Sequence, residues 1–438
     1  MLSAQNNELI TRVGPGTAMG DLLRLYWIPF LFGWEVERDG DPQRVRLLGE
    51  DVIAFRDSNG HVGLIQNNCP HRGAALFFGR NEEGGLRCVY HGWKFAADGA
   101  CLDMPNEPAE SDFKHKVRAT AYPCVERAGV VWTYMGPQVP PPPLPGLEWL
   151  DLPETHVAAS KRVQNTNWMQ ALEGDIDQSH LSFTHRSLKP DEDPSGDPRI
   201  ARIRKADTRP RFEVVRTRYG TCIAAGREAP DDYHYWRISQ HLMPFHTMTG
   251  PYGKDPLRNW RAWVPIDDTT SVVIGVTFHP RRPLTPEERT RPRTPGWVWT
   301  ISPEQRAPAT SQPFGRWRSR LDLGNDFGID RQIQRTENFS GIRETWAQDA
   351  APQVGMGPVN NRTVEHLGTS DLAIVAVRRR LLDAAKALRE RGEVPGEIAE
   401  PQSYAVRSDA LFLRADQKWY ETTSERRMVL AGTNPDCA

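Results

Sequence analysis

The stretch that decides the fold is CPHRGAALFFGRNEEGGLRCVYHGWKF, residues 69–95, in which two cysteine–histidine motifs flank a glycine-rich segment. The first motif contains Cys69 and His71, and the second contains Cys88 and His91; a glycine follows each histidine within two residues. Thiolates and imidazoles at such short spacings are typical of metal ligands. We therefore expect these four side chains to bind a metal centre.

Two kinds of centre fit these ligands. A structural zinc ion accepts two thiolates and two imidazoles in a tetrahedron. A 2Fe–2S cluster of the Rieske kind accepts cysteines on one iron and histidines on the other. Because neutral imidazoles bring less negative charge than thiolates, the second arrangement is easier to reduce. The ligand types alone leave both centres open.

The residues around the ligands favour the iron–sulfur cluster. Cys69-Pro-His-Arg-Gly73 and Cys88-Val-Tyr-His-Gly-Trp93 resemble the two ligand loops of the Rieske domain. The resemblance implies that the two cysteines hold one iron and the two histidines hold the other. The glycine of each loop is expected to bring the backbone close to the cluster and to donate its N–H group to a sulfide.

The overall composition is that of an ordinary globular protein. The chain has 438 residues, 25% of them charged, and a net charge of -1, which gives no support to nucleic-acid binding. No apolar run approaches the roughly 18 residues of a membrane span. The first ten residues, MLSAQNNELI, lack the basic and apolar regions of a signal peptide. We predict a cytoplasmic protein without membrane contact, in which the six cysteines form no disulfide scaffold.

The first part of the chain has the pattern of a small all-β unit. Residues 43–48, 52–56, 62–65 and 130–134 are strand-like and are separated by turn signals. The proline run at 140–145 favours a stiff spacer. We predict an N-terminal domain at 1–150 and a second domain at 151–438; a proline-rich surface loop within a single domain is the alternative.

The second part mixes helices with strands. A helix is indicated around residues 168–172, and strands at 211–225, 233–245 and 260–279, which are rich in aromatic and β-branched residues. A further helix begins near Thr369, with Ser370 as its cap and Gly392 as its stop. The fold class is therefore α+β: an all-β Rieske domain, then a catalytic domain with an antiparallel sheet and packed helices.

A second histidine motif, Asp177-x-x-His180-x-x-x-x-His185, lies in this second part. Two histidines five apart point about 140° away from each other on an ideal helix. They can converge on one metal only if the helix is distorted or ends between them. The spacing alone also allows two unrelated surface histidines.

The same stretch resembles the mononuclear iron motif of the Rieske non-heme iron oxygenases. The resemblance implies that His180 and His185 bind ferrous iron with a distant carboxylate, for which we choose Asp349 over Asp326, Asp330 and Asp371. Two histidines and one carboxylate leave one side of the iron open. Asp177 is then expected to carry electrons between subunits, which implies a homo-oligomer, a trimer or stacked trimers.

The nearest resemblance is to the phthalate dioxygenase type. It implies the oxygenase component of a multicomponent system that uses O2 and NADH-derived electrons to cis-dihydroxylate an aromatic carboxylate. The electrons would come through a separate flavin and iron–sulfur reductase, since the chain has no glycine-rich dinucleotide fingerprint after a strand. The alternatives are a monooxygenase or O-demethylase of methoxylated aromatic acids, and a non-catalytic Rieske electron carrier.

Arginine is the natural partner of a planar carboxylate. Arg227, Arg237 and Arg261 lie beside apolar strand-like segments of the second domain. From this position we predict Arg227 and Arg261 as substrate-binding residues.

Overall fold

The predicted strands of the first part form three small antiparallel sheets in the computed structural model, which describes residues 1–438 except 109, 190–196, 254, 291–300 and 430–438. One sheet has the order β1 (Trp27–Phe32), β11 (Val130–Tyr134), β10 (Cys124–Arg127). The next has the order β2 (Gln43–Leu47), β3 (Glu50–Arg56), β4 (Val62–Gln66), β9 (Ala121–Tyr122). The third has the order β5 (Arg80–Glu82), β6 (Gly85–Arg87), β7 (Lys94–Phe95), β8 (Cys101–Asp103).

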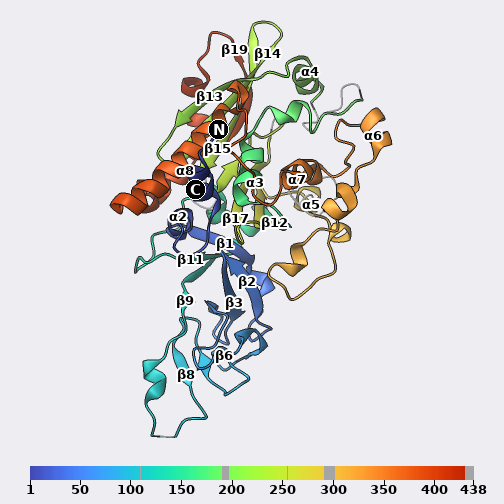
Figure 1. Ribbon diagram of the computed structural model, residues 1–438. Helices are drawn as coiled ribbons and strands as arrows, with labels where there is room; N and C mark the ends of the chain where they lie inside the picture. The colour runs from blue at the N-terminus through green and yellow to red at the C-terminus, as the bar shows by residue number, and fades with distance from the viewer. Residues whose placement is uncertain (109, 190–196, 254, 291–300, 430–438) are drawn as a thin grey trace.

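A separate apolar core fixes the two cysteine–histidine loops. One loop leaves the buried strand β4 and the other connects β6 to β7. Buried Phe55, Leu76 and Phe95 pack in one cluster with Cys69 and Cys88. Burying these apolar side chains supplies the driving force that holds the loops together at the end of this half (Figure 1).

The second part contains one large antiparallel sheet. Its order is β12 (Val157–Gln164), β18 (Ser271–Phe278), β17 (Arg258–Pro265), β16 (His246–Met248), β15 (Tyr233–Leu242), β14 (Gly220–Ala229), β13 (Arg211–Arg216), with β19 (Asp409–Arg414) also paired to β15. The strands predicted at 211–225 and at 260–279 are each two strands, because the chain turns back between Arg216 and Gly220 and between Pro265 and Ser271. The α+β fold class is confirmed.

The described helices are α1 (Ala4–Thr11), α2 (Ala18–Arg24), α3 (Trp168–Ile176), α4 (Pro198–Ala206), α5 (Pro286–Thr290), α6 (Arg331–Thr336), α7 (Thr345–Gly355), α8 (Leu372–Arg391) and α9 (Trp419–Thr422) (Figure 1). Of these, α3, α4 and α8 pack on strands of the large sheet. α8 lies along β13 and β14 and also contacts α1 and α2, while α3 packs on α7 and on β15–β17. None of the described helices is long and apolar enough to cross a lipid bilayer.

The predicted cap of α8 is wrong, although its stop is confirmed. Asp371 occupies the cap position, because a 3-10 turn at Thr369–Asp371 precedes the helix and takes up Ser370. Gly392 ends the helix at φ +68°, a left-handed conformation that costs glycine least.

Buried contacts tie the two parts together. Trp132 of β11 lies against Trp149 and against Trp260 of β17, with ring centroids 6.0 and 5.8 Å away. Within the second part, Glu173 of α3 forms ion pairs with Arg362 at 3.2 Å and with Arg378 of α8 at 2.6 Å. These contacts fix α3, which leads directly into the second histidine motif. The domain boundary at residue 150 stays a prediction.

Candidate metal centres

The two cysteine–histidine loops have the same backbone geometry. The N–H of Gly73 donates to the carbonyl of Cys69 at 2.9 Å, and the N–H of Gly92 donates to the carbonyl of Cys88 at 3.0 Å. In both loops the cysteine N–H donates to the carbonyl of the residue after the glycine, at 2.8 Å. Gly73 and Gly92 have φ values of +77° and +78°. The loops therefore need glycine at these positions because the backbone has a positive φ there. The expectation that the glycine N–H groups point to a sulfide is wrong, since they donate to the cysteine carbonyls.

The side chains of these loops fit an iron–sulfur cluster. Cys69 and Cys88 are buried free thiols, 3% and 2% exposed. The rings of His71 and His91 lie 4.5 Å apart, and Nδ1 of His71 is buried without a hydrogen-bond partner. Such a buried polar atom is costly unless a metal or a donor satisfies it. Burial raises the pKa of the Cys69 thiol to about 11, so its thiolate requires the positive charge of a bound metal.

A single zinc ion does not suit the same four residues. In a zinc tetrahedron all ligand atoms lie within about 4 Å of one another. In the part of the chain that the structure describes, the one set of three or more candidate ligands within 4.8 Å is His180, His185 and Asp349. The four loop residues do not form such a set, which fits ligands that are divided between two irons.

The second centre is that set of three. Nε2 of His185 lies 3.0 Å from Oδ1 of Asp349 and 3.3 Å from Nε2 of His180. Nε2 of His180 lies 3.5 Å from the same Asp349 oxygen. Helix α3 ends at Ile176 and a 3-10 turn begins at His180, so the backbone bends between the helix and the histidines. Both histidines therefore follow the helix, which ends before His180 and not between the two as the spacing argument supposed.

The electrostatics at this centre favour an ionised carboxylate. Burial disfavours the charged form of Asp349, but His185 first, and then His180 and Arg162, lower its pKa below the usual range. Asp349 comes from α7, whereas the histidines come from the segment after α3. The three converging atoms, two neutral nitrogens and one carboxylate oxygen, are the ligand set that ferrous iron takes in oxygenases.

Asp177 lies directly behind this centre. Its Oδ2 is 3.5 Å from Nδ1 of His180, and its Oδ1 accepts from the N–H and the hydroxyl of Ser179, both at 2.7 Å. Asp177 is therefore held against one of the two converging histidines, and its role as an electron bridge stays a prediction. The two centres lie in different halves of the chain, with β6 and β8 at one end and α3 and α7 in the other half (Figure 1).

The two predicted substrate arginines lie in different surroundings. Arg261 is 1% exposed, ion-paired to Asp175 and hydrogen-bonded to Thr249 at 3.2 Å. Arg227 is fully buried and donates through Nη2 to the carbonyl of Gln178 at 3.0 Å and to Oγ of Ser182 at 3.3 Å. Arg227 therefore binds the chain on both sides of His180.

Sequence reasoning missed Tyr235 as a neighbour of Arg227. The register of β14 and β15 places Tyr235 opposite Arg227 and Arg237 opposite Ala225, on the same face of the sheet. Nη1 of Arg227, Nη1 of Arg237 and the Tyr235 hydroxyl are buried without a partner in the described structure. The alternation Tyr235-x-Arg237 in a strand was the available signal.

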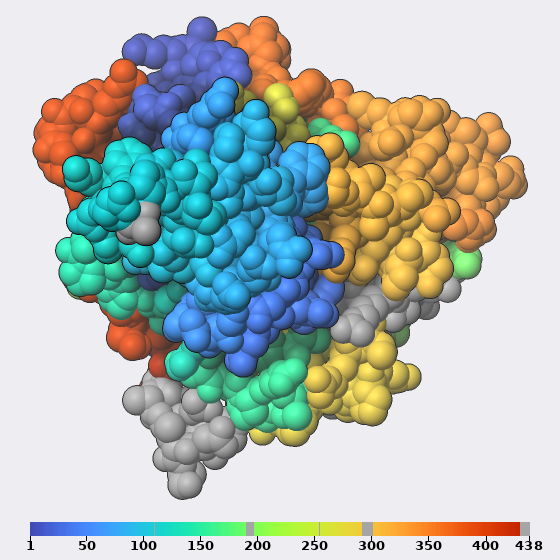
Figure 2. All heavy atoms as spheres, turned by 90° about the horizontal axis from the view of Figure 1, so that it is seen from below, coloured from blue at the N-terminus to red at the C-terminus, as the bar shows by residue number. Residues whose placement is uncertain are grey.

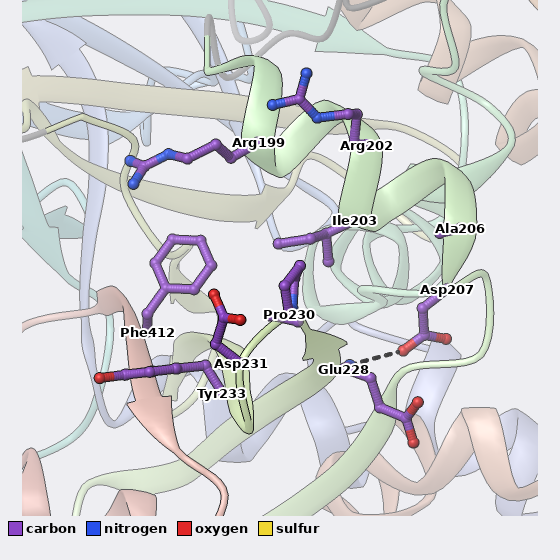
Figure 3. Close-up of a pocket in the computed structure, with 11 residues that line it drawn as sticks. Arg199, Arg202, Ile203, Ala206, Asp207, Glu228, Pro230, Asp231, Tyr233 and Phe412 are labelled. Carbon is purple, nitrogen blue, oxygen red and sulfur yellow. Dashed lines mark hydrogen bonds between the residues drawn. The ribbon is translucent and has the colours of Figure 1, made fainter.

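A surface pocket of about 760 Å³ lies outside this group, between α4, the β14–β15 hairpin and β19 (Figure 3). Its apolar wall includes Ile203 and Phe412, and Phe412 lies against Tyr235 with ring centroids 5.1 Å apart. Its rim has both signs of charge, with Arg199 and Asp231 among the residues in Figure 3. None of the three converging iron-site residues lines it.

Comparison with protein families covers both halves. Residues 26–123 match the Rieske 2Fe-2S domain, and residues 133–433 match the family described as LigXa C-terminal domain like. The terminal oxygenase of carbazole 1,9a-dioxygenase from Nocardioides aromaticivorans IC177 has the same fold, with a TM-score of 0.54, 19% identity, and coverage of 87% of this chain and 100% of that one.

Similar proteins are oxygenase subunits. The chain is 40% identical to the 3-chlorobenzoate-3,4-dioxygenase oxygenase subunit of Comamonas testosteroni, over 98% of this chain and 99% of the relative. It is 37% identical to the phthalate 4,5-dioxygenase oxygenase subunit of Pseudomonas putida, over 92% and 90%. It is 33% identical to the 5,5'-dehydrodivanillate O-demethylase oxygenase subunit of Sphingobium sp. (strain NBRC 103272 / SYK-6), over 91% and 84%.

These matches extend over both halves, so the non-catalytic electron carrier is ruled out and the two predicted cofactors, a Rieske cluster and a mononuclear iron, are confirmed for the family. The chain belongs to the Rieske non-heme iron oxygenases, as the oxygenase component of a Rieske dioxygenase system.

Proposed function

We propose that this oxygenase uses O2 and NADH-derived electrons to cis-dihydroxylate an aromatic carboxylate such as phthalate. The observation that carries the proposal is a pair of buried nitrogens without a partner in the described structure, Nη1 of Arg227 and Nη1 of Arg237. Arg227 also binds the carbonyl of Gln178, just before the turn that begins at His180. Two of the relatives are named for benzoate-type substrates, 3-chlorobenzoate and phthalate.

The types of ligand at each site indicate which metal group it would hold. Cys69, His71, Cys88 and His91 would hold the 2Fe–2S cluster; His180, His185 and Asp349 would hold ferrous iron. When bound, these groups supply one-electron transfer and oxygen activation. The protein's own part is to present three ligands on one side, to keep Asp349 ionised and to link His180 to Asp177.

A substrate carboxylate would complete the contacts of Arg227 and Arg237. Arg237 gives Nε and Nη2 to the carbonyl of Gly250, at 3.0 and 2.9 Å, and Arg227 uses Nε and Nη2 on other oxygens. Neither forms an ion pair with a described carboxylate, and burial, then the charges of Arg204 and Arg237, lower the pKa of Arg227 to about 10. A buried cation of this kind is expensive unless an anion pairs with it. A carboxylate bridging the two Nη1 atoms, with the Tyr235 hydroxyl as a further donor, satisfies all three groups.

Arg261 has no such role in this proposal. Its guanidinium is already neutralised by Asp175, whose other oxygen accepts from Thr247. We therefore propose Arg237, in place of Arg261, as the second substrate-binding arginine.

The Arg227→Gln variant tests whether Arg227 binds the carboxylate of the substrate. Loss of a charge-assisted hydrogen bond costs about 1.5–3 kcal/mol, so the dissociation constant for phthalate should rise roughly 10–100-fold. Binding of the uncharged phthalamide, measured by the same calorimetric titration, should change less than about threefold.

The matched control is Arg216→Gln, an exposed arginine on the neighbouring strand β13, which should leave both dissociation constants unchanged. If Arg227→Gln weakens the binding of phthalate and of phthalamide equally, the substitution damages the binding site as a whole, and Arg227 does not bind the carboxylate.

An O-demethylase is the second candidate. The 33% identity to the 5,5'-dehydrodivanillate O-demethylase oxygenase subunit extends over most of both chains. Methoxybenzoates carry the same carboxylate, so the arginine pair suits either outcome.

We also propose the electron-transfer partners and the assembly. Related structures include a complex of the carbazole dioxygenase oxygenase with its ferredoxin, at TM-score 0.54 and 18% identity over 90% of this chain and 98% of that one. The N-terminal half occupies the centre of the face in Figure 2, and Val89 and Tyr90 beside the cluster loop are 57% and 59% exposed. A separate flavin and iron–sulfur reductase would deliver NADH electrons to this end.

The Asp177 bridge would need a neighbouring subunit, hence a trimer or stacked trimers. The free buried thiols fit a reducing, cytoplasmic compartment.

A further inference from the structure

Gln348 contacts one of the proposed iron ligands and precedes another. It lies on α7 immediately before Asp349 and is 7% exposed. Its Oε1 is 2.7 Å from Nδ1 of His185, and its Nε2 donates to the carbonyl of Ile342 at 2.7 Å. Both ends of the buried amide are therefore engaged.

These two bonds determine which nitrogen of His185 is free. A backbone carbonyl only accepts, so the Gln348 amide must direct its NH2 group to Ile342 and its oxygen to His185. Nδ1 of His185 must then be the protonated nitrogen. The lone pair is left on Nε2, the atom that lies 3.0 Å from Asp349.

The other histidine is held differently. Nδ1 of His180 faces the carboxylate of Asp177, whereas Nδ1 of His185 faces a neutral amide. Because Gln348 and Asp349 are neighbours on one helix, α7 supplies a ligand and fixes the ring of the next one in a single rigid unit.

We infer that Gln348 is a positioning residue that sets the tautomer and ring orientation of His185 and thereby the affinity of the mononuclear site for its metal. The inference rests on the proposed iron site. Hydrogen-bond partners of metal-ligating histidines typically contribute 10–100-fold to metal affinity, roughly.

The test is metal binding by enzyme that keeps its Rieske cluster and has been stripped of mononuclear iron. Co(II) is the probe, followed by its ligand-field absorption in competition with a chelator. Gln348→Met removes both hydrogen bonds at similar size, and we expect about 10–100-fold weaker Co(II) binding. Gln348→Glu keeps the acceptor for His185 but loses the donor to Ile342, and we expect affinity within about threefold of wild type.

The matched control is Gln353→Met. Gln353 is on the same helix, equally buried at 7%, and hydrogen-bonded to Gln164 instead of an iron-site residue. It should bind Co(II) like wild type. If Gln348→Met binds Co(II) as tightly as wild type, or if the Glu variant is as weak as the Met variant, Gln348 has no positioning role. If wild-type protein shows no Co(II) spectrum that is lost in Asp349→Ala, the iron site itself is misassigned.

Discussion

Asp349→Ala should lower product formation by more than about 100-fold while leaving the Rieske cluster intact. Hydrogen-bond partners of metal ligands alone contribute roughly 10–100-fold to metal affinity or activity, and a carboxylate that binds the metal directly contributes more. Asp349 is the only one of the four aspartates considered that converges with His180 and His185. Without it, two neutral imidazoles remain, and the charge that favours a dication is lost.

The measurement combines steady-state product analysis with iron content and the visible spectrum. Asp349→Ala should retain the cluster absorption and lose the mononuclear iron. Asp326→Ala, a change on the exposed turn at Leu323–Gly328, should retain both. A variant at Asp349 that keeps its iron and its activity would assign the third ligand to another residue.

Cys88→Ser should eliminate the red-brown absorption and all sustained turnover. Iron–sulfur clusters require soft thiolate ligands, and a serine hydroxyl is a poor substitute. Cys88 is 2% exposed and lies in the same buried apolar cluster as Cys69. The His180 and His185 centre should still bind Co(II), because it lies in the other half of the chain.

Cys124→Ser is the control for this variant. Cys124 is a partly buried thiol on β10 that lies in neither of the two cysteine–histidine loops. It should retain the cluster and full activity. A Cys88→Ser protein that keeps its colour would refute the assignment of the first centre.

The sequence predicted the parts of the fold that depend on local patterns. Strands such as β3 and β4 follow from alternation, and Gly392 follows from helix-stop chemistry. Ser370 was misplaced because a short turn precedes α8, and helix ends vary by one or two residues for such reasons.

The candidate site also has a part that local sequence predicts and a part that depends on long-range contacts. The motif around His180 could be found from spacing, but its convergence with α7 is a long-range property: 163 residues separate His185 from Gln348. Asp349 came from a family resemblance, since nothing in a single sequence fixes such a pairing.

The arginines illustrate the limit most clearly. Arg227 and Arg261 both lie in apolar strands and are both buried. Only the three-dimensional contacts separate them, because Asp175 reaches Arg261 and no described carboxylate pairs with Arg227. Cross-strand register, which pairs Arg227 with Tyr235, depends on the fold as a whole.

The most direct test of the central claim is product analysis under 18O2. The holoenzyme would be supplied with NADH, a phthalate-type reductase and ferrous iron, and offered phthalate, isophthalate, terephthalate, methoxybenzoates and one neutral arene. We predict a carboxylate product that has gained two labelled oxygens and two hydrogens. Consumption of NADH with only peroxide formed from every benzoate, or dihydroxylation confined to the neutral arene, would contradict the assignment of an aromatic carboxylate as the substrate.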